Sequence, residues 1–260
     1  MRKIVDQKLQ KGYTLDLGKL IEESFEYFKK TFLIGGLAFM IIGVAIVICY
    51  ATLFGIIFGF GNFVDSITQL GLNASKPSYV IGNVVLTTIF SAIMAPLTAG
   101  FINLNHLARN NKEINVSNVF EFFKSIYFRD IFTAYLIIGF TNSVVSAISL
   151  LNPQNIALSL LTSVFSGVVA LFTIFVIPLI IYGEQNFSSA ISKSISLFLK
   201  QPLYIILALI IAVIGCFLGF ITLCIGIFFT FPYLYSMHYT IYEQAIGFED
   251  KSEIEEIGLE

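Results

Sequence analysis

The sequence predicts an all-α integral membrane protein whose six transmembrane helices form three hairpins, each preceded by a cytoplasmic interfacial amphipathic helix. The chain is 57% hydrophobic and only 12% charged, which is about half the charged share of a soluble domain. No Asp, Glu, Lys or Arg occurs within 31–64, 77–108, 131–183 or 201–242. Because a helix crosses a bilayer with about 20 apolar residues, each of these runs is long enough to span the membrane at least once.

The first two uncharged runs predict one span each. The run 31–64 is too long for one upright helix and too short for two, so we predict a tilted span over 32–58. Residues 65–78 are polar by comparison and are expected to form a loop. The second span is predicted over 80–106.

The last two uncharged runs predict two spans each. Asn152-Pro153-Gln154-Asn155 is a strong turn signal, and it divides the third run into spans over 131–150 and 156–182. The fourth run holds spans over 203–221 and 223–243 only if the turn between them is tight, and the candidate turn positions are Gly215, Gly219 and Gly226. A single re-entrant element over 201–242 is the alternative.

The distribution of basic residues predicts the orientation. Six spans place alternate loops on opposite sides of the membrane, and of the 15 Lys and Arg residues only Lys76 falls on the second side. Basic residues concentrate on the cytoplasmic side, so both termini of this multi-pass protein of the cell (inner) membrane are predicted to be cytoplasmic. Residues 1–30 carry too many charges for a signal peptide. We expect an N-terminal cytoplasmic tail over 1–14, a single membrane domain over 15–247 and an acidic C-terminal tail over 248–260.

Three short segments, 16–21, 115–120 and 186–191, begin in the same way. Each starts with Asp or Asn, which can accept the free amides of a helix's first turn, so each is expected to begin a capped helix. The apolar residues that follow recur at helical spacing, which predicts amphipathic helices lying at the cytoplasmic interface. The predicted apolar stripes are Leu17, Leu20, Ile21, Phe25 and Phe28 in the first segment, Val116, Val119, Phe120, Phe123 and Tyr127 in the second, and Phe187, Ala190, Ile191 and Phe198 in the third.

Each even-numbered span contains a proline, namely Pro96, Pro178 and Pro232. A proline inside a helix frees a carbonyl and kinks the helix, which a membrane tolerates only where neighbouring groups satisfy the backbone. The unit of interfacial helix, span and proline-containing span therefore recurs three times in the same orientation, as parallel repeats would. The predicted repeat units are 15–107, 114–183 and 185–245.

Several longer stretches resemble a known group of bacterial proteins. They are LGKLIEESFEYFKKTF before the first span, APLTAGF in the second, VIPLIIYGEQNFSSAISKSISLFLKQP from the fourth span onward and FTFPYLYSMHYTIYEQ in the sixth. These stretches are similar to bacterial multi-span membrane proteins of unknown function, which include the YciC-like proteins and the membrane domain of some glycerophosphoryl diester phosphodiesterases. The resemblance implies a helical multi-span fold and no established activity. A four-histidine iron site of the carotene oxygenase type is excluded, because the chain has only 2 His.

Few side chains that could carry chemistry lie near the predicted spans. Asn105, His106, Glu184 and His238 fall near the cytoplasmic ends of the even-numbered spans, where they could form the mouth of a cavity. Polar anchoring is the simpler interpretation for the histidines, and a solvated helix end for Glu184 and Glu243. Two histidines without a carboxylate at ligand spacing do not predict a metal site. We therefore predict no catalytic residue, no cofactor and no metal.

The preferred functional hypothesis is a non-enzymatic membrane protein that acts in the envelope as a scaffold, a partner subunit or a lipid-interacting factor. Membrane lipids and a membrane protein are the expected partners, and the net charge of −2 gives no reason to expect nucleic acid. The alternative is a transporter or flippase-like protein for an apolar or amphiphilic solute, although no span carries the central acid or base that ion-coupled carriers use. A third hypothesis is an intramembrane enzyme that uses Glu184 with His106 or His238.

Overall fold

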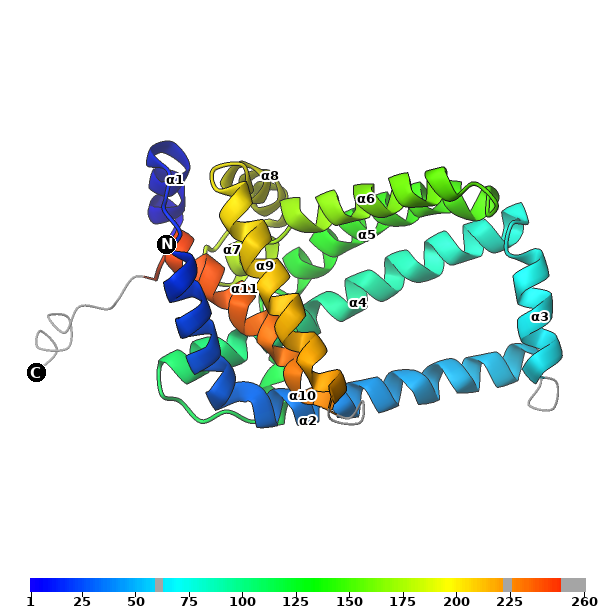
Figure 1. The fold of residues 1–260 in the computed structure, drawn as a ribbon, viewed down its shortest axis with the longest axis horizontal. Helices are drawn as coiled ribbons and strands as arrows, with labels where there is room; N and C mark the ends of the chain where they lie inside the picture. The colour runs from blue at the N-terminus through cyan, green and yellow to red at the C-terminus, as the bar shows by residue number, and fades with distance from the viewer. Residues whose placement is uncertain (59–62, 222–225, 249–260) are drawn as a thin grey trace, which may run out of the picture.

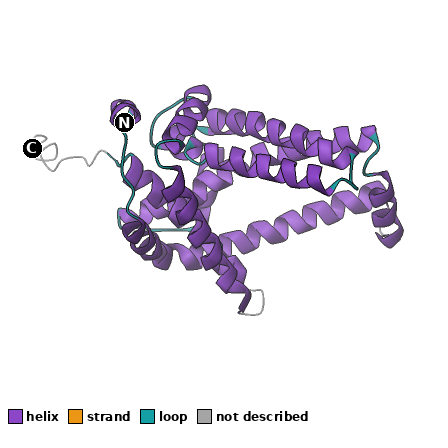
Figure 2. Ribbon diagram, turned by 45° about the horizontal axis from the view of Figure 1, so that its top comes forward, coloured by secondary structure: helices purple, strands orange, loops and turns teal. Residues whose placement is uncertain are grey.

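The computed structural model describes residues 1–58, 63–221 and 226–248 (Figure 1). Within these ranges the chain is almost entirely helical and contains no strand (Figure 2), which confirms the predicted all-α class. The helices are α1 (Arg2–Lys11), α2 (Leu17–Phe58), α3 (Phe63–Asn73), α4 (Pro77–Arg109), the 3₁₀ helix η1 (Val116–Phe123), α5 (Phe128–Leu151), α6 (Ile156–Phe172), α7 (Val176–Ile181), α8 (Phe187–Phe198), α9 (Pro202–Phe217), the 3₁₀ helix η2 (Leu218–Ile221), α10 (Gly226–Thr230) and α11 (Pro232–Ala245).

Five helical stretches of the described chain are long and apolar enough to cross a membrane. They are Leu17–Ile56 in α2, Pro77–Arg109 in α4, Phe128–Leu151 in α5, Ile156–Ile181 across α6 and α7, and Pro202–Phe220 across α9 and η2. Large apolar side chains on these stretches are exposed, as in a protein whose surrounding solvent is lipid. The fold is therefore compatible with a multi-pass membrane protein.

One continuous helix, α2, contains both the first amphipathic segment and the first predicted span, and it bends part-way along its length (Figure 1). Asp16 caps its start, because the Asp16 Oδ1 accepts the Lys19 amide at 3.1 Å. Neither proline nor a turn interrupts the chain from Leu17 to Phe58, so the helix continues through the expected junction.

The buried face of the first part of α2 differs from the predicted stripe. Leu20, Ser24 and Thr31 are buried, whereas Ile21 and Phe25 are exposed. A lipid bilayer is as apolar as a protein core, so apolar side chains gain little by turning inward, and small polar side chains pack between helices instead. The amphipathic pattern therefore predicted the helix but not which face it buries.

Two further elements differ from the prediction. The expected loop over 65–78 consists mostly of α3, and only residues 74–76 connect α3 to α4. Apolar residues recur every three or four positions from 63 to 72, which favours a helix despite the polar residues between them. The second amphipathic segment is the 3₁₀ helix η1. With three residues per turn, η1 buries Val119 and Phe122, while Phe120 of the predicted stripe is exposed.

The predicted turn at 152–155 is confirmed, since α5 ends at Leu151 and the Asn155 amide donates to the Asn152 carbonyl at 3.0 Å. Asn155 Oδ1 then accepts the Leu158 amide at 3.1 Å and caps α6. The predicted turn between the last two spans includes residues 222–225, which lie outside the described residues. Beside that turn, a Cβ on Gly219 would lie 2.2 Å from Thr230 Oγ1, so η2 and α10 approach each other closely.

The three prolines occupy different helical positions. Pro96 lies inside α4, as predicted. The fourth predicted span breaks over 173–175, and Pro178 follows in the short helix α7. Pro232 is the first residue of α11, directly after a break at Phe231. This position suits proline, because the first turn of a helix does not use its missing amide hydrogen.

The three proline-containing segments, α4, α7 and α11, meet at the centre of the bundle. The Tyr182 hydroxyl donates to Asn103 Oδ1 at 3.2 Å, and the Ser236 hydroxyl donates to Asn105 Oδ1 at 2.7 Å. Every residue of α7 is buried, as are most residues of α11 and of the second half of α4. In contrast, α2, α5 and α9 present much exposed apolar surface.

Each amphipathic segment packs against one of these central segments. Against α4, η1 lies so close that a Cβ on Gly100 would be 2.1 Å from the Val119 carbonyl oxygen. Ser194 joins α8 to the break before α7, because its hydroxyl donates to the Phe172 carbonyl at 2.6 Å and accepts the Phe175 amide at 3.1 Å. The start of α2 packs against α11, and the ring centroids of Tyr27 and Tyr239 lie 5.4 Å apart.

Candidate functional site

A cavity of about 580 Å³ lies between α4, α5, α6, α9 and α11. Its lining is mostly apolar, and its polar members are Ser91, Thr98, Thr173, Tyr135, Tyr235, Asn142 and His238. None of the described residues that line it is charged. This size and composition are typical of sites that hold a small apolar molecule and orient it with a few polar groups.

His238 stabilises one wall of the cavity. Its Nε2 forms a hydrogen bond with the Ile174 carbonyl. Ile174 lies in the break before α7 and precedes Pro178 by four residues, and because proline has no amide hydrogen, Pro178 cannot donate to this carbonyl. His238 therefore supplies the neighbouring group that a proline in a membrane helix requires. Since a carbonyl only accepts, Nε2 carries the proton, and Nδ1 of a neutral histidine is left as an acceptor.

Two other polar side chains of the cavity lack partners. The Asn142 Oδ1 is buried without a hydrogen-bond partner. No hydrogen bond reaches the Tyr135 hydroxyl within the part of the chain that the structure describes. Both residues belong to α5 and lie two helical turns apart, hence on one face. Leaving a buried polar group unpaired costs about 1–3 kcal/mol, so this face is suited to hydrogen-bonding a ligand.

The other sequence-predicted candidates do not line this cavity. Asn105 bonds to Ser236 inside the core, and the His106 Nδ1 lies 3.1 Å from the Tyr239 hydroxyl. Glu184 is exposed with a φ of 53°, and its backbone carbonyl accepts a hydrogen bond from Arg2 Nε at 2.8 Å. Among the described residues, no hydrogen bond joins the Glu184 carboxylate to either histidine.

Aromatic rings fill the centre of the bundle at the end that carries most of the Lys and Arg residues, which we call the basic end. The centroid of the His106 ring lies 4.9 Å from that of Tyr182 and 4.8 Å from that of Phe248. The rings of Tyr239 and Phe248 stack at 5.5 Å. Packed rings therefore occupy the region around His106 where the sequence suggested a cavity mouth.

The basic end also contains an ion pair that the sequence interpretation missed. Arg109 Nε lies 2.5 Å from Glu243 Oε1, and their side chains are only 27% and 15% exposed. The Tyr27 hydroxyl donates to the same carboxylate oxygen at 3.3 Å. The sequence does place Arg109 and Glu243, which have opposite charges, at the same end of two predicted spans. Treating Glu243 as a solvated helix end overlooked this possible pair.

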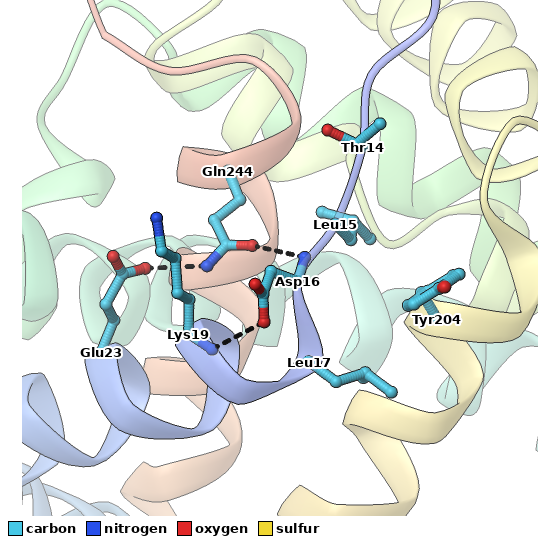
Figure 3. A pocket seen from close by; sticks show the side chains of 8 residues that line it. All are labelled: Thr14, Leu15, Asp16, Leu17, Lys19, Glu23, Tyr204 and Gln244. Carbon is cyan, nitrogen blue, oxygen red and sulfur yellow. Dashed lines mark hydrogen bonds between the residues drawn. The ribbon is translucent and has the colours of Figure 1, made fainter.

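A second hollow, of about 700 Å³, lies where the chain enters α2 (Figure 3). Gln244 of α11 reaches across it, as Figure 3 shows: its Oε1 accepts the Asp16 amide at 3.2 Å, and its Nε2 donates to Glu23 at 2.9 Å. Because these polar groups hydrogen-bond to one another, Gln244 links the start of α2 to the end of α11.

The arrangement as a whole can hold an uncharged molecule and hydrogen-bond to it. In the described ranges no group of three His, Cys, Asp or Glu side chains could hold a metal ion. No family model, no curated protein and no solved structure matches the chain.

Proposed function

We propose that this is a non-enzymatic, multi-pass protein of the bacterial inner membrane that binds membrane lipid, alone or as a subunit of a larger membrane complex. The observation that carries the proposal is the uncharged cavity of about 580 Å³ inside the bundle. The packing of Phe248 on His106 at the basic end supports it, because a path for a polar solute would need an open, hydrated centre there.

We further propose six spans with both termini in the cytoplasm. Together α10 and α11 cover Gly226–Ala245, about 30 Å of helix, which equals the thickness of the hydrocarbon core. The pairing of Asn105 with Ser236 and of Arg109 with Glu243 supports the same direction for α4 and α11, as two outward-to-inward spans require. The proposed orientation is based on the distribution of Lys and Arg, because Lys76 is the one basic residue that six spans would place on the non-cytoplasmic side.

We also propose that the three predicted repeat units form a closed ring. In support of this, the amphipathic segment of each unit contacts the proline-containing segment of another unit. These pairs are η1 with α4, α8 with α7, and the start of α2 with α11. The kinship with the YciC-like group is a proposal that rests on the sequence stretches alone.

Lipid retention tests the proposed function. The full chain would be purified from bacterial membranes in a mild detergent and analysed by native mass spectrometry. We expect a stable adduct with a lipid or with a membrane-protein partner, and repeated recovery of the bare monomer would contradict the proposal. Reconstitution into liposomes tests the flippase-like alternative, since a scaffold leaves the distribution of lipid between the two leaflets unchanged.

A further inference from the structure

We infer that the cavity of about 580 Å³ binds an uncharged lipid that presents both a hydroxyl and a carbonyl group, such as a diacylglycerol. This inference rests on the proposed lipid-binding function and adds the chemical class of the ligand.

The lining excludes a charged ligand. No Lys, Arg, Asp or Glu is among the described lining residues. Asn142 lies 14 residues along α5 from Phe128, about 21 Å along the helix axis, and thus close to the middle of this 24-residue helix. A phosphate group at this depth would lose its hydration without gaining a counter-charge, which is strongly unfavourable.

The unpaired polar atoms specify what the ligand must offer. Tyr135 brings a hydroxyl that can donate to a carbonyl, and the Asn142 amide can both donate and accept. The Asn142 Oδ1 is a buried acceptor that needs an O–H or N–H group. A ligand with ester carbonyls and one free hydroxyl satisfies both kinds of partner, whereas a pure hydrocarbon would leave the Asn142 oxygen unpaired.

The cavity can be entered from the lipid. Gly167 and Ala170 line it from α6, and both are exposed on the outer surface of the bundle. A Cβ on Gly167 would meet no atom within 4 Å, so no described neighbouring helix covers this position. A membrane lipid can therefore reach the site sideways, without passing the aromatic rings at the basic end.

A pair of matched lipids tests the inference on the purified full chain. Dioctanoylglycerol and dioctanoylphosphatidic acid have the same acyl chains and differ in the charged phosphate. We expect saturable stabilisation against heat by dioctanoylglycerol, with the phosphatidic acid binding about tenfold more weakly or not at all. Equal stabilisation by both lipids would overturn the inference.

Variants of α5 connect that binding to the cavity. Asn142→Leu and Tyr135→Phe should each weaken dioctanoylglycerol binding about fivefold, as expected for one lost hydrogen bond. The control Thr141→Val changes an exposed neighbour on the same helix and should bind as the wild type does. Asn142→Leu also removes a buried unpaired oxygen, so the ligand-free melting temperature should hold or rise. Unchanged binding by the Asn142→Leu/Tyr135→Phe double variant would overturn the inference.

The two proposals fail in different ways. A protein that retains lipid or a partner through purification, yet does not prefer dioctanoylglycerol, contradicts this inference and leaves the proposed function standing. Recovery of the bare monomer with no response to either lipid contradicts both.

Discussion

The contact between α4 and η1 predicts that Gly100→Ala destabilises the protein. A Cβ at this position would lie 2.1 Å from the carbonyl oxygen, 2.5 Å from the carbonyl carbon and 2.6 Å from the Cα of Val119. These are backbone atoms, so no side-chain rotation relieves the clash, and η1 must move by about 1 Å to reach an ordinary contact. Such overpacking costs about 1–3 kcal/mol, and the higher helix propensity of alanine offsets up to about 1 kcal/mol. Subtracting the full offset leaves a net loss of up to about 2 kcal/mol in the free energy of unfolding.

The matched control is Gly82→Ala in the same helix. A Cβ on Gly82 meets no atom within 4 Å, so the change should stabilise the protein by about 0.5–1 kcal/mol through backbone entropy alone. Both variants would be unfolded by denaturant in one detergent, with helical circular dichroism as the signal. Shifts of the same sign and size for Gly100→Ala and Gly82→Ala would refute the close-contact argument.

Three other predictions concern the N-terminal region, the topology and the buried ion pair. Burial raises the pKa of Tyr13, whose hydroxyl donates to the Leu197 carbonyl at 2.7 Å. The folded state therefore keeps a proton that the unfolded chain releases above about pH 10, so the stability of the protein should fall as the pH rises past this value. The fall should be less steep in Tyr13→Phe. If the melting temperature of both proteins falls equally steeply from about pH 8 to 11, the argument is wrong. With the native cysteines replaced by alanine, Ser75→Cys should react with a membrane-impermeant maleimide in intact cells, and Lys112→Cys only after lysis; the reverse pattern would invert the proposed topology. Glu243→Gln should lower the free energy of unfolding by about 1.5–3 kcal/mol, because it breaks the buried pair with Arg109. The control Glu26→Gln breaks an exposed pair with Lys29 and should cost under about 1 kcal/mol. Similar losses in the two variants would show that burial does not strengthen the pair of Arg109 with Glu243.

Features that depend on a few neighbouring residues were predictable from the sequence. Asp16 and Asn186, at the starts of two of the three predicted segments, each accept an amide three residues ahead, at 3.1 and 2.9 Å. Each of these bonds closes within four residues, so residue type and spacing are sufficient to predict it. The same holds for the turn that ends at Asn155.

Features that depend on distant partners were not predictable. Residues 116–123 could form an α-helix or a 3₁₀ helix, and the choice is coupled to how closely Val119 approaches Gly100 on α4. The hydrogen bond from His238 to Ile174 joins residues 64 apart in the chain, and the cavity requires five helices to be placed together. Proline at 178 indicated that a carbonyl needs a partner, but nothing local identified His238 as that partner.

The pairing of α2 with α11 has a consequence for folding during synthesis. Translation makes α2 before α11, yet Asp16 and Glu23 at the start of α2 bond to Gln244 of α11. Until α11 is made, the Ser24 hydroxyl therefore lacks its Tyr233 partner, whose hydroxyl lies 3.4 Å away in the folded chain. The start of α2 can therefore reach its final packing only after α11 has been made.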